Sequence, residues 1–426
     1  MGGIARTDRC DIAIAGGGPA GALAAILLQR AGARVALVDA GTGTDRLEGA
    51  APRLVAALRA QRIGIAGLGP LLPRRARWGD LAEVPNREHA LRRPAFDAGL
   101  RAQAADEGVH LVAGTVRRVS PGRIEIVDRP SITAGLVFEA RGRRAPAGPA
   151  HLRGPASITI GGWGAPCDGA EVVAGAHGWR WSIGADGPSW RQATLSARAL
   201  RTGLAEAWGR LWDLPLPQDP HVHASELRLT APDLDPALPR LGDAAVAMDP
   251  LSGHGLFWAL ASALQAVPLA RALFDGAAQL AGDFYRDRVA GTFWRQARVG
   301  RDFYRLANLD TPFWTERRGW PDDLAAETPA PETVRITPRV IVRDGRLARA
   351  EVLVTPQEPD GVAFVHDVEI APILSRLGAA PLPDRADFAA RILPHVPPDR
   401  AGRVHDWLTS RGIATADRPL HKEVLQ

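Results

Sequence analysis

Lysine is almost absent from this chain of 426 residues, and the single one is Lys422, close to the C-terminal residue. Every other side-chain cation is an arginine or a histidine, and a guanidinium does not replace a lysine amine in catalysis because it is delocalised and stays charged. The net charge is only +5, and short arginine clusters such as 74–77 and 141–144 lack interleaved aromatics. A nucleic-acid partner is therefore not expected.

Cysteine is equally scarce, with only Cys10 and Cys167, which are too far apart in sequence for a CxxC pair. Their number excludes a disulfide framework, and their spacing argues against a zinc site and fits a reducing compartment. No convincing membrane span is present either, because glycines and a proline interrupt the apolar stretch 12–28. That stretch runs into a second strand-like segment, unlike a secretory signal. We expect a cytoplasmic protein without a membrane partner, and the sequence leaves its oligomeric state open.

The first positive signal is a glycine-rich turn between a strand and a helix. Residues 11–15 predict a short apolar strand, and Gly16, Gly18 and Gly21 follow at the GxGxxG spacing. The first glycine allows the tight turn, the second lets the backbone approach phosphate oxygens, and the third lets the next helix pack on the strand. The helix expected over 19–31 then points free N–H groups at a pyrophosphate.

A second strand over 35–39 completes this unit and ends in Asp39, where an acid can bind ribose hydroxyls. Strand, glycines, helix, second strand and acid occur in the order of a dinucleotide-binding unit, which an ordinary glycine-rich turn would not show. The residues predicted to contact the dinucleotide are Gly16, Gly18, Pro19, Ala20, Gly21, Asp39 and Ala40.

Two distal segments resemble the FAD monooxygenases of the p-hydroxybenzoate-hydroxylase superfamily, on its branch near the flavin-dependent halogenases. Residues 137–143 (VFEARGR) are similar to the strand and turn that read DATGR in that family. Residues 241–255 contain GDAA and DPLSGHG, which resemble the family's GDAA…DPLSGxG. The resemblance covers roughly residues 8 to 290 and implies that the dinucleotide is FAD.

The same resemblance implies roles for single residues. Asp243 would bind the ribityl or pyrophosphate region, and the loop 250–256 would lie along the isoalloxazine ring, where helix N–H groups can stabilise an anionic reduced flavin. Arg93 would lie near the flavin, as would Glu48, although its segment keeps only the acid and the last proline of the family's GESLPP. The further cofactor residues implied are Glu48, Arg93, Val116, Gly142, Gly242, Asp243, Pro250, Gly253, Gly255 and Leu256.

Trp179 and Trp181 belong to a segment that resembles the WxWxI element of flavin-dependent halogenases. Those enzymes depend on a lysine that captures hypohalous acid between flavin and substrate, and this chain has none before Lys422. We therefore expect a single-component monooxygenase that hydroxylates an electron-rich aromatic ring through a flavin hydroperoxide, with NADH or NADPH as the transient electron donor. On a strand the two tryptophans would share one face and either line a substrate cavity or belong to the core.

Catalytic residues are expected in and beside the 249–255 block. Taken alone, the Asp249-Pro250 pair would be a simple helix-stop turn, and His254 either contacts the flavin or is a hydrogen-bonded turn residue. The catalytic candidates are Asp249, Pro250, His254, Trp179 and Trp181.

Two other groups of residues are expected to be structural. His221 and His223 alternate as metal ligands do, but no third ligand is evident, so a surface strand is expected. For the segment 74–78 a solvated loop is expected, and the alternative is a docking site for an anionic partner or a nicotinamide cofactor.

The predicted architecture is α/β. A Rossmann-type FAD-binding domain over 8–150 and 236–290 would contain an inserted antiparallel-sheet substrate domain over 151–235. Residues 291–330 would form an aromatic helical segment, packed on the flavin domain, and a linker. Beyond them, an Asp-Gly pair between apolar runs predicts a β-hairpin, and three short helices would complete a small α+β, winged-helix-like domain over 331–426.

Such a C-terminal domain grips peptides or DNA in other proteins, and the modest charge disfavours DNA; a structural or dimerisation role stays open. The whole layout resembles the flavin monooxygenases of quinohemoprotein amine dehydrogenase maturation, which hydroxylate a tryptophan on the way to a tryptophylquinone cofactor. The resemblance implies that the substrate is a tryptophan of a partner protein, recognised by the C-terminal domain. The alternatives are a small-molecule aromatic hydroxylase or halogenase-like tailoring enzyme, a prenyl reductase on the same scaffold, and a flavin-bound transcription regulator.

Overall fold

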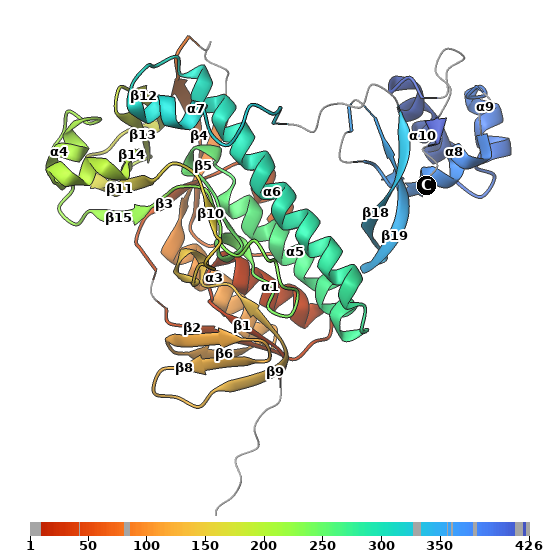
Figure 1. Cartoon of the computed structure of the whole chain (residues 1–426), viewed down its shortest axis with the longest axis horizontal. Helices are drawn as coiled ribbons and strands as arrows, with labels where there is room; N and C mark the ends of the chain where they lie inside the picture. The colour runs from red at the N-terminus through yellow and green to blue at the C-terminus, as the bar shows by residue number, and fades with distance from the viewer. Residues whose placement is uncertain are drawn as a thin grey trace, which may run out of the picture. The chain divides into compact units, whose positions relative to one another are not determined.

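The computed structural model describes residues 10–41, 43–80, 86–326, 334–355, 357–358, 361–377 and 381–413, and the backbone of 421–422. The chain divides into two compact units, 1–324 and 325–426 (Figure 1), and each is described by itself. The linker expected over 321–331 lies in part outside the described residues.

A six-stranded sheet in the order β6-β2-β1-β9-β8-β7 forms the cofactor half of the first unit. Its first four strands are parallel, as expected for a Rossmann-type fold. On one face, Ala13 and Ala15 of β1 pack against Ile124 and Ile126 of the β7–β8 hairpin. The strands are β1 (Cys10–Ala15), β2 (Val35–Asp39), β6 (His110–Ala113), β7 (Val116–Ser120), β8 (Arg123–Ile126) and β9 (Ile132–Glu139).

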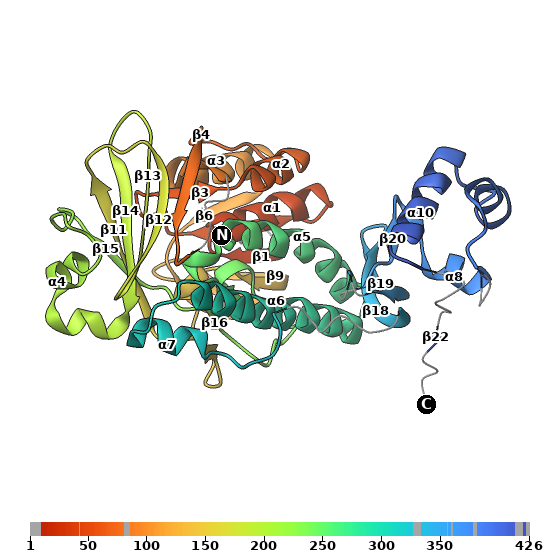
Figure 2. The ribbon, with the colours of Figure 1, turned by 90° about the horizontal axis from the view of Figure 1, so that it is seen from above.

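Three helices accompany this sheet, and Figure 2 shows them from above. They are α1 (Pro19–Arg30), α3 (Arg93–Asp106) and α5 (Gly255–Phe274), and α1 contacts both of the others. The predicted start of α1 is confirmed, because a proline opens it where the missing N–H costs nothing. The helix ends at Arg30, one residue earlier than expected, and Gly32 follows the C-cap residue Ala31 with φ +94°. A further, shorter helix, α2 (Pro52–Ala60), also contacts α5.

An eight-stranded sheet in the order β15-β11-β14-β13-β12-β4-β5-β3 forms the other half of the first unit. Neighbouring strands are antiparallel except for the pair β12 and β4. Three strands come from residues 47–92, so the sheet extends beyond the expected 151–235 segment. The strands are β3 (Leu47–Ala50), β4 (Leu68–Arg77), β5 (Asn86–Arg92), β11 (Ser157–Gly164), β12 (Gly169–Gly175), β13 (Gly178–Gly184), β14 (Ser189–Ser196) and β15 (His221–Ala224).

The prediction of a solvated loop over 74–78 is wrong. Residues 74–77 belong to β4, and Trp78 is buried. The arginines of this segment suggested a loop. In the structure β4 pairs with β5 and β12, and these contacts with neighbouring strands outweigh the low strand propensity of its residues.

The aromatic segment forms α6 (Ala278–Leu306) and α7 (Pro312–Arg318). Its expected packing on the flavin domain is only part of the arrangement, because Tyr304, Phe313 and Trp314 join Trp78 and Trp179 in one buried cluster on the eight-stranded sheet. A short helix, α4, and a small sheet complete the unit: α4 (Leu204–Gly209), β10 (Leu152–Arg153), β16 (Arg228–Leu229) and β17 (Val246–Ala247).

Helix α5 is long and apolar enough to cross a membrane by length and composition. However, 61% of its most apolar window is buried inside the structure, where α5 contacts α1 and α6. A mostly buried apolar helix of this kind is typical of a protein core.

The second unit begins with the predicted hairpin, which is confirmed. β18 (Arg335–Arg343) and β19 (Arg346–Val354) pair in register across Asp344 and Gly345, both with positive φ, as a two-residue primed turn requires. Apolar residues of the helices and β19 form a core of their own. The remaining elements are β20 (Phe364–Val365), β21 (Val368–Glu369), α8 (Ala371–Leu377), α9 (Arg385–Asp387) with the turn Phe388–Ile392, α10 (Pro398–Ser410) and β22 (His421–Lys422).

Two phenylalanines of α6 offer a matched test of this packing. Phe293 is fully buried, whereas Phe303 is 48% exposed. We expect Phe293→Ala to lower the free energy of unfolding by about 3–5 kcal/mol, because it leaves a cavity, and Phe303→Ala to cost much less. Urea unfolding of the two variants measures the difference, and equal losses would contradict this orientation of α6.

Candidate flavin and substrate site

The glycine turn between β1 and α1 leaves open space at one point. Gly16 has φ +109°, and a Cβ on Gly21 would overlap the carbonyl oxygen of Gly16, so turn and helix pack backbone to backbone. A Cβ on Gly18, in contrast, would meet no protein atom within 4 Å. Gly18 is also the N-cap of α1 and provides no side-chain cap, so the first N–H groups of the helix are available to a phosphate.

Asp39 is held beside this turn at the end of β2. Its carboxylate accepts hydrogen bonds from the backbone N–H groups of Gly17 (3.1 Å) and Gly41 (3.2 Å), and Arg101 lies 3.4 Å away. These contacts fix the acid at the place predicted for a ribose, while the next residue, Ala40, is exposed.

The GDAA turn brings Asp243 close to the N-terminus of α1. Gly242 has φ +53°, and a Cβ there would lie 2.6 Å from the Cβ of Ala20, so only glycine permits this approach. Burial raises the pKa of the Asp243 carboxyl, and the guanidinium of Arg143, 3.8 Å away, opposes that effect. Gly142, with φ +61°, lies beside Asp243.

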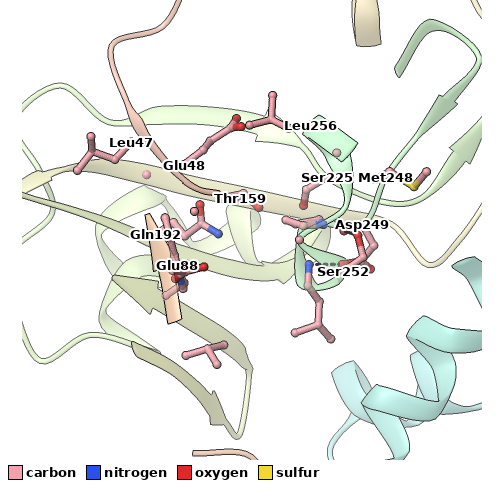
Figure 3. Close-up of a pocket in the computed structure, with 18 of the residues that line it drawn as sticks. Leu47, Glu48, Glu88, Thr159, Gln192, Ser225, Met248, Asp249, Ser252 and Leu256 are labelled. Atoms are coloured by element: carbon pink, nitrogen blue, oxygen red, sulfur yellow. Dashed lines mark hydrogen bonds between the residues drawn. The ribbon is translucent and has the colours of Figure 1, made fainter. Parts of the chain in front are cut away.

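A cavity of about 630 Å³ lies between the 248–256 loop and the eight-stranded sheet (Figure 3). Predicted residues that line it are Glu48, Trp179, Trp181, Asp243, Asp249, Pro250, Gly253, Gly255 and Leu256. The remaining predicted residues do not line it: Gly16, Gly18, Pro19, Ala20, Gly21, Asp39, Ala40, Arg93, Val116, Gly142, Gly242 and His254.

One face of the sheet forms a wall of this cavity. Two rows of residues cross the strands β15, β11, β14 and β13, and the members of each row are paired directly on neighbouring strands. Because side chains alternate along each strand, members of both rows point to the same face. The rows are His221, Gly161, Gln192 and Trp181, and His223, Thr159, Thr194 and Trp179. The predicted common face of the two tryptophans is thus confirmed.

The two histidines lie on β15, a strand at the edge of the sheet, and their partly exposed side chains also line the cavity, which was not predicted. The rings of His221 and His223 stack with centroids 5.0 Å apart. Burial, assisted by His221 and the nearby arginines, lowers the pKa of His223 to about 3, so its imidazole is neutral near pH 7. Among the described residues, no group of three potential metal ligands is present, which leaves the pair without the partners of a metal site.

Glu48 and Arg93 form the centre of a partly buried ion cluster at the edge of the cavity. Glu48 Oε1 accepts from the guanidiniums of Arg46 and Arg93, each at 2.6 Å, and Arg93 also pairs with Asp97 at 3.0 Å. Burial alone would raise the pKa of Glu48, but the two guanidiniums outweigh it and lower the pKa to about 2. The cluster therefore keeps Glu48 ionised beside the cofactor loop.

A second group of polar side chains, contributed by α6 and α7, holds the 249–253 loop in place. Asp249 accepts hydrogen bonds from the N–H of Leu251 and from the hydroxyl of Tyr304, both at 2.9 Å. Burial and the charge of Asp249 raise the pKa of Tyr304 well above its ordinary value, so the hydroxyl stays a donor. Arg317, 3% exposed, lies over the Tyr304 and Phe313 rings and donates to Ser157 Oγ at 2.6 Å.

His254 lies apart from the cavity. Its imidazole Nε2 is 2.6 Å from Nη2 of Arg53, and the residue faces a separate small void with Gln296 and Phe303. His254 therefore does not line the cavity, and this geometry does not support its predicted catalytic role. Asp249 and Pro250 line the cavity from the loop, and Trp179 and Trp181 line it from the sheet.

Several polar residues of the cavity belong to no recognisable sequence motif. Glu88, Gln192, Thr159 and Ser225 each come from a different strand or loop, and Figure 3 shows them around one space. Only strand register, which the sequence did not specify across eight strands, places them together.

Comparison with known proteins supports a flavin site. A family of FAD-binding domains matches residues 9–53. The solved structure of the peptidyl tryptophan dihydroxylase QhpG, essential for tryptophylquinone cofactor biogenesis, is 33% identical and covers 95% of this chain and 100% of that one, with a TM-score of 0.78. The flavin-dependent halogenase CmlS is 16% identical, covers 99% of both chains and has a TM-score of 0.70. A menaquinone reductase of Mycolicibacterium smegmatis is 27% identical over 59% of this chain and 74% of its own.

The residues present fit FAD. Gly18 leaves space where a phosphate needs it, the α1 N-terminus offers uncapped N–H groups, and the cavity continues from Asp243 along the 248–256 loop. Asp39 would hold the adenosine ribose, and Asp243 and the loop would hold the ribityl chain and the ring. FAD, when bound, supplies the activation of oxygen. The protein's own groups position the ring, keep water out and fix the charges around it.

Gly18 is expected to matter for FAD but not for folding. In Gly18→Ala, the new methyl group meets no protein atom and fills space at the helix N-terminus. We expect FAD affinity to fall about tenfold or more, a loss of at least about 1.4 kcal/mol, with an unchanged melting temperature of the apoprotein. Fluorescence titration with FAD measures the affinity. Gly291→Ala, in α6 and equally free of clashes, is the control; equal affinities of both variants would argue against a phosphate at Gly18.

Glu48 is expected to make stability depend on pH in the acid range. A carboxyl whose pKa falls from 4.5 to about 2 on folding stabilises the protein above pH 4.5, and this contribution disappears as the pH falls towards 2. Glu48→Gln removes that contribution, roughly 3 kcal/mol. Urea unfolding at pH 7, 5 and 3.5 should show the difference from wild type shrinking with acid. Glu171→Gln, which breaks the more exposed pair with Arg77, should show no such trend.

The fold class and the FAD cofactor predicted from the sequence are confirmed by these comparisons. The likeness to the halogenases is one of fold, because their identity is low. The identity to the tryptophan dihydroxylase is higher and extends over nearly all of both chains, including the second unit. The chain belongs to the FAD-dependent monooxygenase family that includes the peptidyl tryptophan dihydroxylase QhpG.

Proposed function

We propose that this protein hydroxylates a tryptophan side chain of a partner protein during the biogenesis of a tryptophan-derived quinone cofactor. The observation that carries the proposal is the cavity, which lies against the flavin loop, is walled by Trp179, Trp181 and Trp190 and belongs to a chain one-third identical to a peptidyl tryptophan dihydroxylase. Aromatic walls favour a flat apolar ring, and an electron-rich indole is the natural acceptor of electrophilic oxygen.

The charged groups around the cavity disfavour halogenation. Its cationic side chains are all arginines: Arg46, Arg53, Arg74 and Arg143. Since the sequence has no lysine before Lys422, the amine that the halogenases use is missing, and a guanidinium does not take its place. Oxygen transfer to carbon needs no such amine. The halogenase-like fold therefore serves a different reaction.

Within this site the protein's residues have separate tasks. Asp249, held by Tyr304, fixes the loop that starts at Pro250 and lies along the ring. Glu48 and Arg93 stabilise the β3 edge of the cavity. Trp179 and Trp181 form the substrate wall. The buried tryptophans of the wall exclude water on the substrate side, which preserves reactive oxygen for the substrate.

Three further parts of the proposal concern partners and place. NADH or NADPH is the electron donor, taken transiently, as the sequence has no second GxGxxG turn. The second unit, which has its own core, recognises the partner protein. Free cysteines, Cys10 and Cys167, fit a reducing cytoplasm.

Mass spectrometry tests the proposal. The FAD-loaded chain, NADH or NADPH, oxygen-18 gas and a tryptophan-bearing partner protein should give one or two heavy oxygen atoms on a single tryptophan. The same partner with that tryptophan replaced by phenylalanine should gain none and should not stimulate NADH oxidation. Unmodified partner together with an oxidised small phenol would favour a small-molecule hydroxylase. Turnover of menaquinone without oxygen would instead favour the prenyl reductase that the similarity to a menaquinone reductase suggests.

A further inference from the structure

The cavity contains a carboxylate that none of the functions above uses. Glu88 lies on β5 and is only 9% exposed. It lines the cavity on the side of the sheet, and Asp249 and Ser252 line it on the side of the loop (Figure 3). A buried acid requires partners, because removal of a carboxylate from water is costly. The partners it has account for only one of its two oxygens.

Glu88 Oε1 is the oxygen with partners. The indole N–H of Trp181 donates to it at 3.1 Å, and Nε of Arg74 lies 3.9 Å away, too far for a hydrogen bond. Oε2 accepts from no donor in the part of the chain that the structure describes. Glycine at position 49 makes room for this oxygen, since a Cβ there would overlap it. The carboxyl group is thus fixed at one oxygen and open at the other.

The surroundings of this open oxygen have the shape and polarity of an indole site. Trp181 and Trp190 lie on the cavity wall, and Gln192 stands opposite Trp181 in register. The carboxamide of Gln192 makes no hydrogen bond to the described residues, and both Gln192 of β14 and Glu88 of β5 line the cavity together with these tryptophans. A flat ring with one N–H donor fills such a space, and its donor meets an acceptor at the end of the slot.

We propose that Glu88 is the specificity-determining residue for tryptophan: its free carboxylate oxygen accepts the N–H of the target indole, while Trp181 holds the other oxygen. The inference rests on the proposed function, since it names the contact by which that site recognises its substrate. No bond of the indole is broken in this contact. Glu88 orients the ring, so that the same carbon atoms are presented to the flavin in each turnover.

The free energy of the hydrogen bonds favours recognition of the substrate indole by Glu88 over a role limited to holding the Trp181 side chain in place. A neutral amide oxygen would satisfy the Trp181 N–H without the cost of a buried charge. A hydrogen bond to a charged acceptor contributes about 1.5–3 kcal/mol, roughly a 10- to 150-fold preference over a ligand without the donor. The carboxylate is therefore useful for a ligand that arrives with an N–H and leaves again.

The proposal also gives the binding of indole a pH dependence. Burial raises the pKa of Glu88, and Arg74 is the charged side chain that opposes this effect. Of the two strands beside β5, β4 carries this Arg74 and β3 presents Gly49, which does not titrate; β13, further along the sheet, contributes Trp181, which does not titrate either. Because the ionised form accepts the N–H better, indole affinity should rise as the pH rises through the pKa of Glu88.

Indole and benzothiophene are suitable probes, since they differ in little more than N–H against sulfur. Each is titrated into the FAD-loaded full chain, and binding is followed by the perturbed flavin absorbance. Wild type should bind indole at least about tenfold more tightly than benzothiophene. Glu88→Gln should reduce the preference to about threefold and remove its pH dependence, and Glu88→Met should abolish the preference. Glu171→Gln, an acid on β12 that does not line the cavity, should leave it unchanged.

The outcomes separate the two proposals. Equal affinities of wild type for the two probes, a preference that survives in both Glu88 variants, or no spectral response to indole would each overturn the role of Glu88. A clear indole preference in a wild-type protein that places no oxygen on any partner tryptophan would leave the binding contact intact and overturn the proposed reaction.

Discussion

The partly buried charge cluster of Arg46, Glu48, Arg93 and Asp97 is the constraint on which the cavity depends. Two cations and two anions face one another, so no charge is left uncompensated out of water. Glu48 belongs to β3 of the eight-stranded sheet, whereas Arg93 begins α3 beside the parallel sheet. The cluster therefore fixes the two halves of the first unit against each other at the edge of the cavity. Gly49, which follows Glu48 on β3, makes room for the side chain of Glu88.

The aromatic segment supplies the matching constraint on the other side of the cavity. Tyr304 of α6 donates to Asp249, and Arg317 of α7 lies over the Tyr304 ring and reaches Ser157 of β11. A chain of contacts thus runs from the loop beside the flavin, through two helices, to the sheet. Removal of water from this chain keeps the Tyr304 hydroxyl protonated and the loop in one position. Residues remote from the motifs therefore determine the geometry of the motif loop.

The cofactor site was predictable from the sequence because its residues are contiguous. The glycine turn, Asp39 and the 242–255 block each form a local pattern whose backbone requirements fix the residue types. Of the wall formed by β11, β13, β14 and β15, only Trp179 and Trp181 were predicted, because each of the other three strands contributes one or two side chains that belong to no motif. His221 and His223 looked like surface residues until the β11–β15 register placed them beside Thr159 and Gly161. Register depends on long-range pairing, which no short segment encodes.

This division between contiguous and dispersed residues explains how one fold serves different reactions. The loop and the glycine turn must keep their backbone conformations to hold FAD, and the halogenase CmlS shares the fold at an identity of only 16%. A side chain on the sheet face can change without any change of backbone, because alternation directs it into the cavity whatever its type. The carboxylate of Glu88 on β5 is a side chain of this kind. The chemistry of the ring is fixed by the cofactor half, and the choice of the molecule to be oxidised belongs to the face of the sheet.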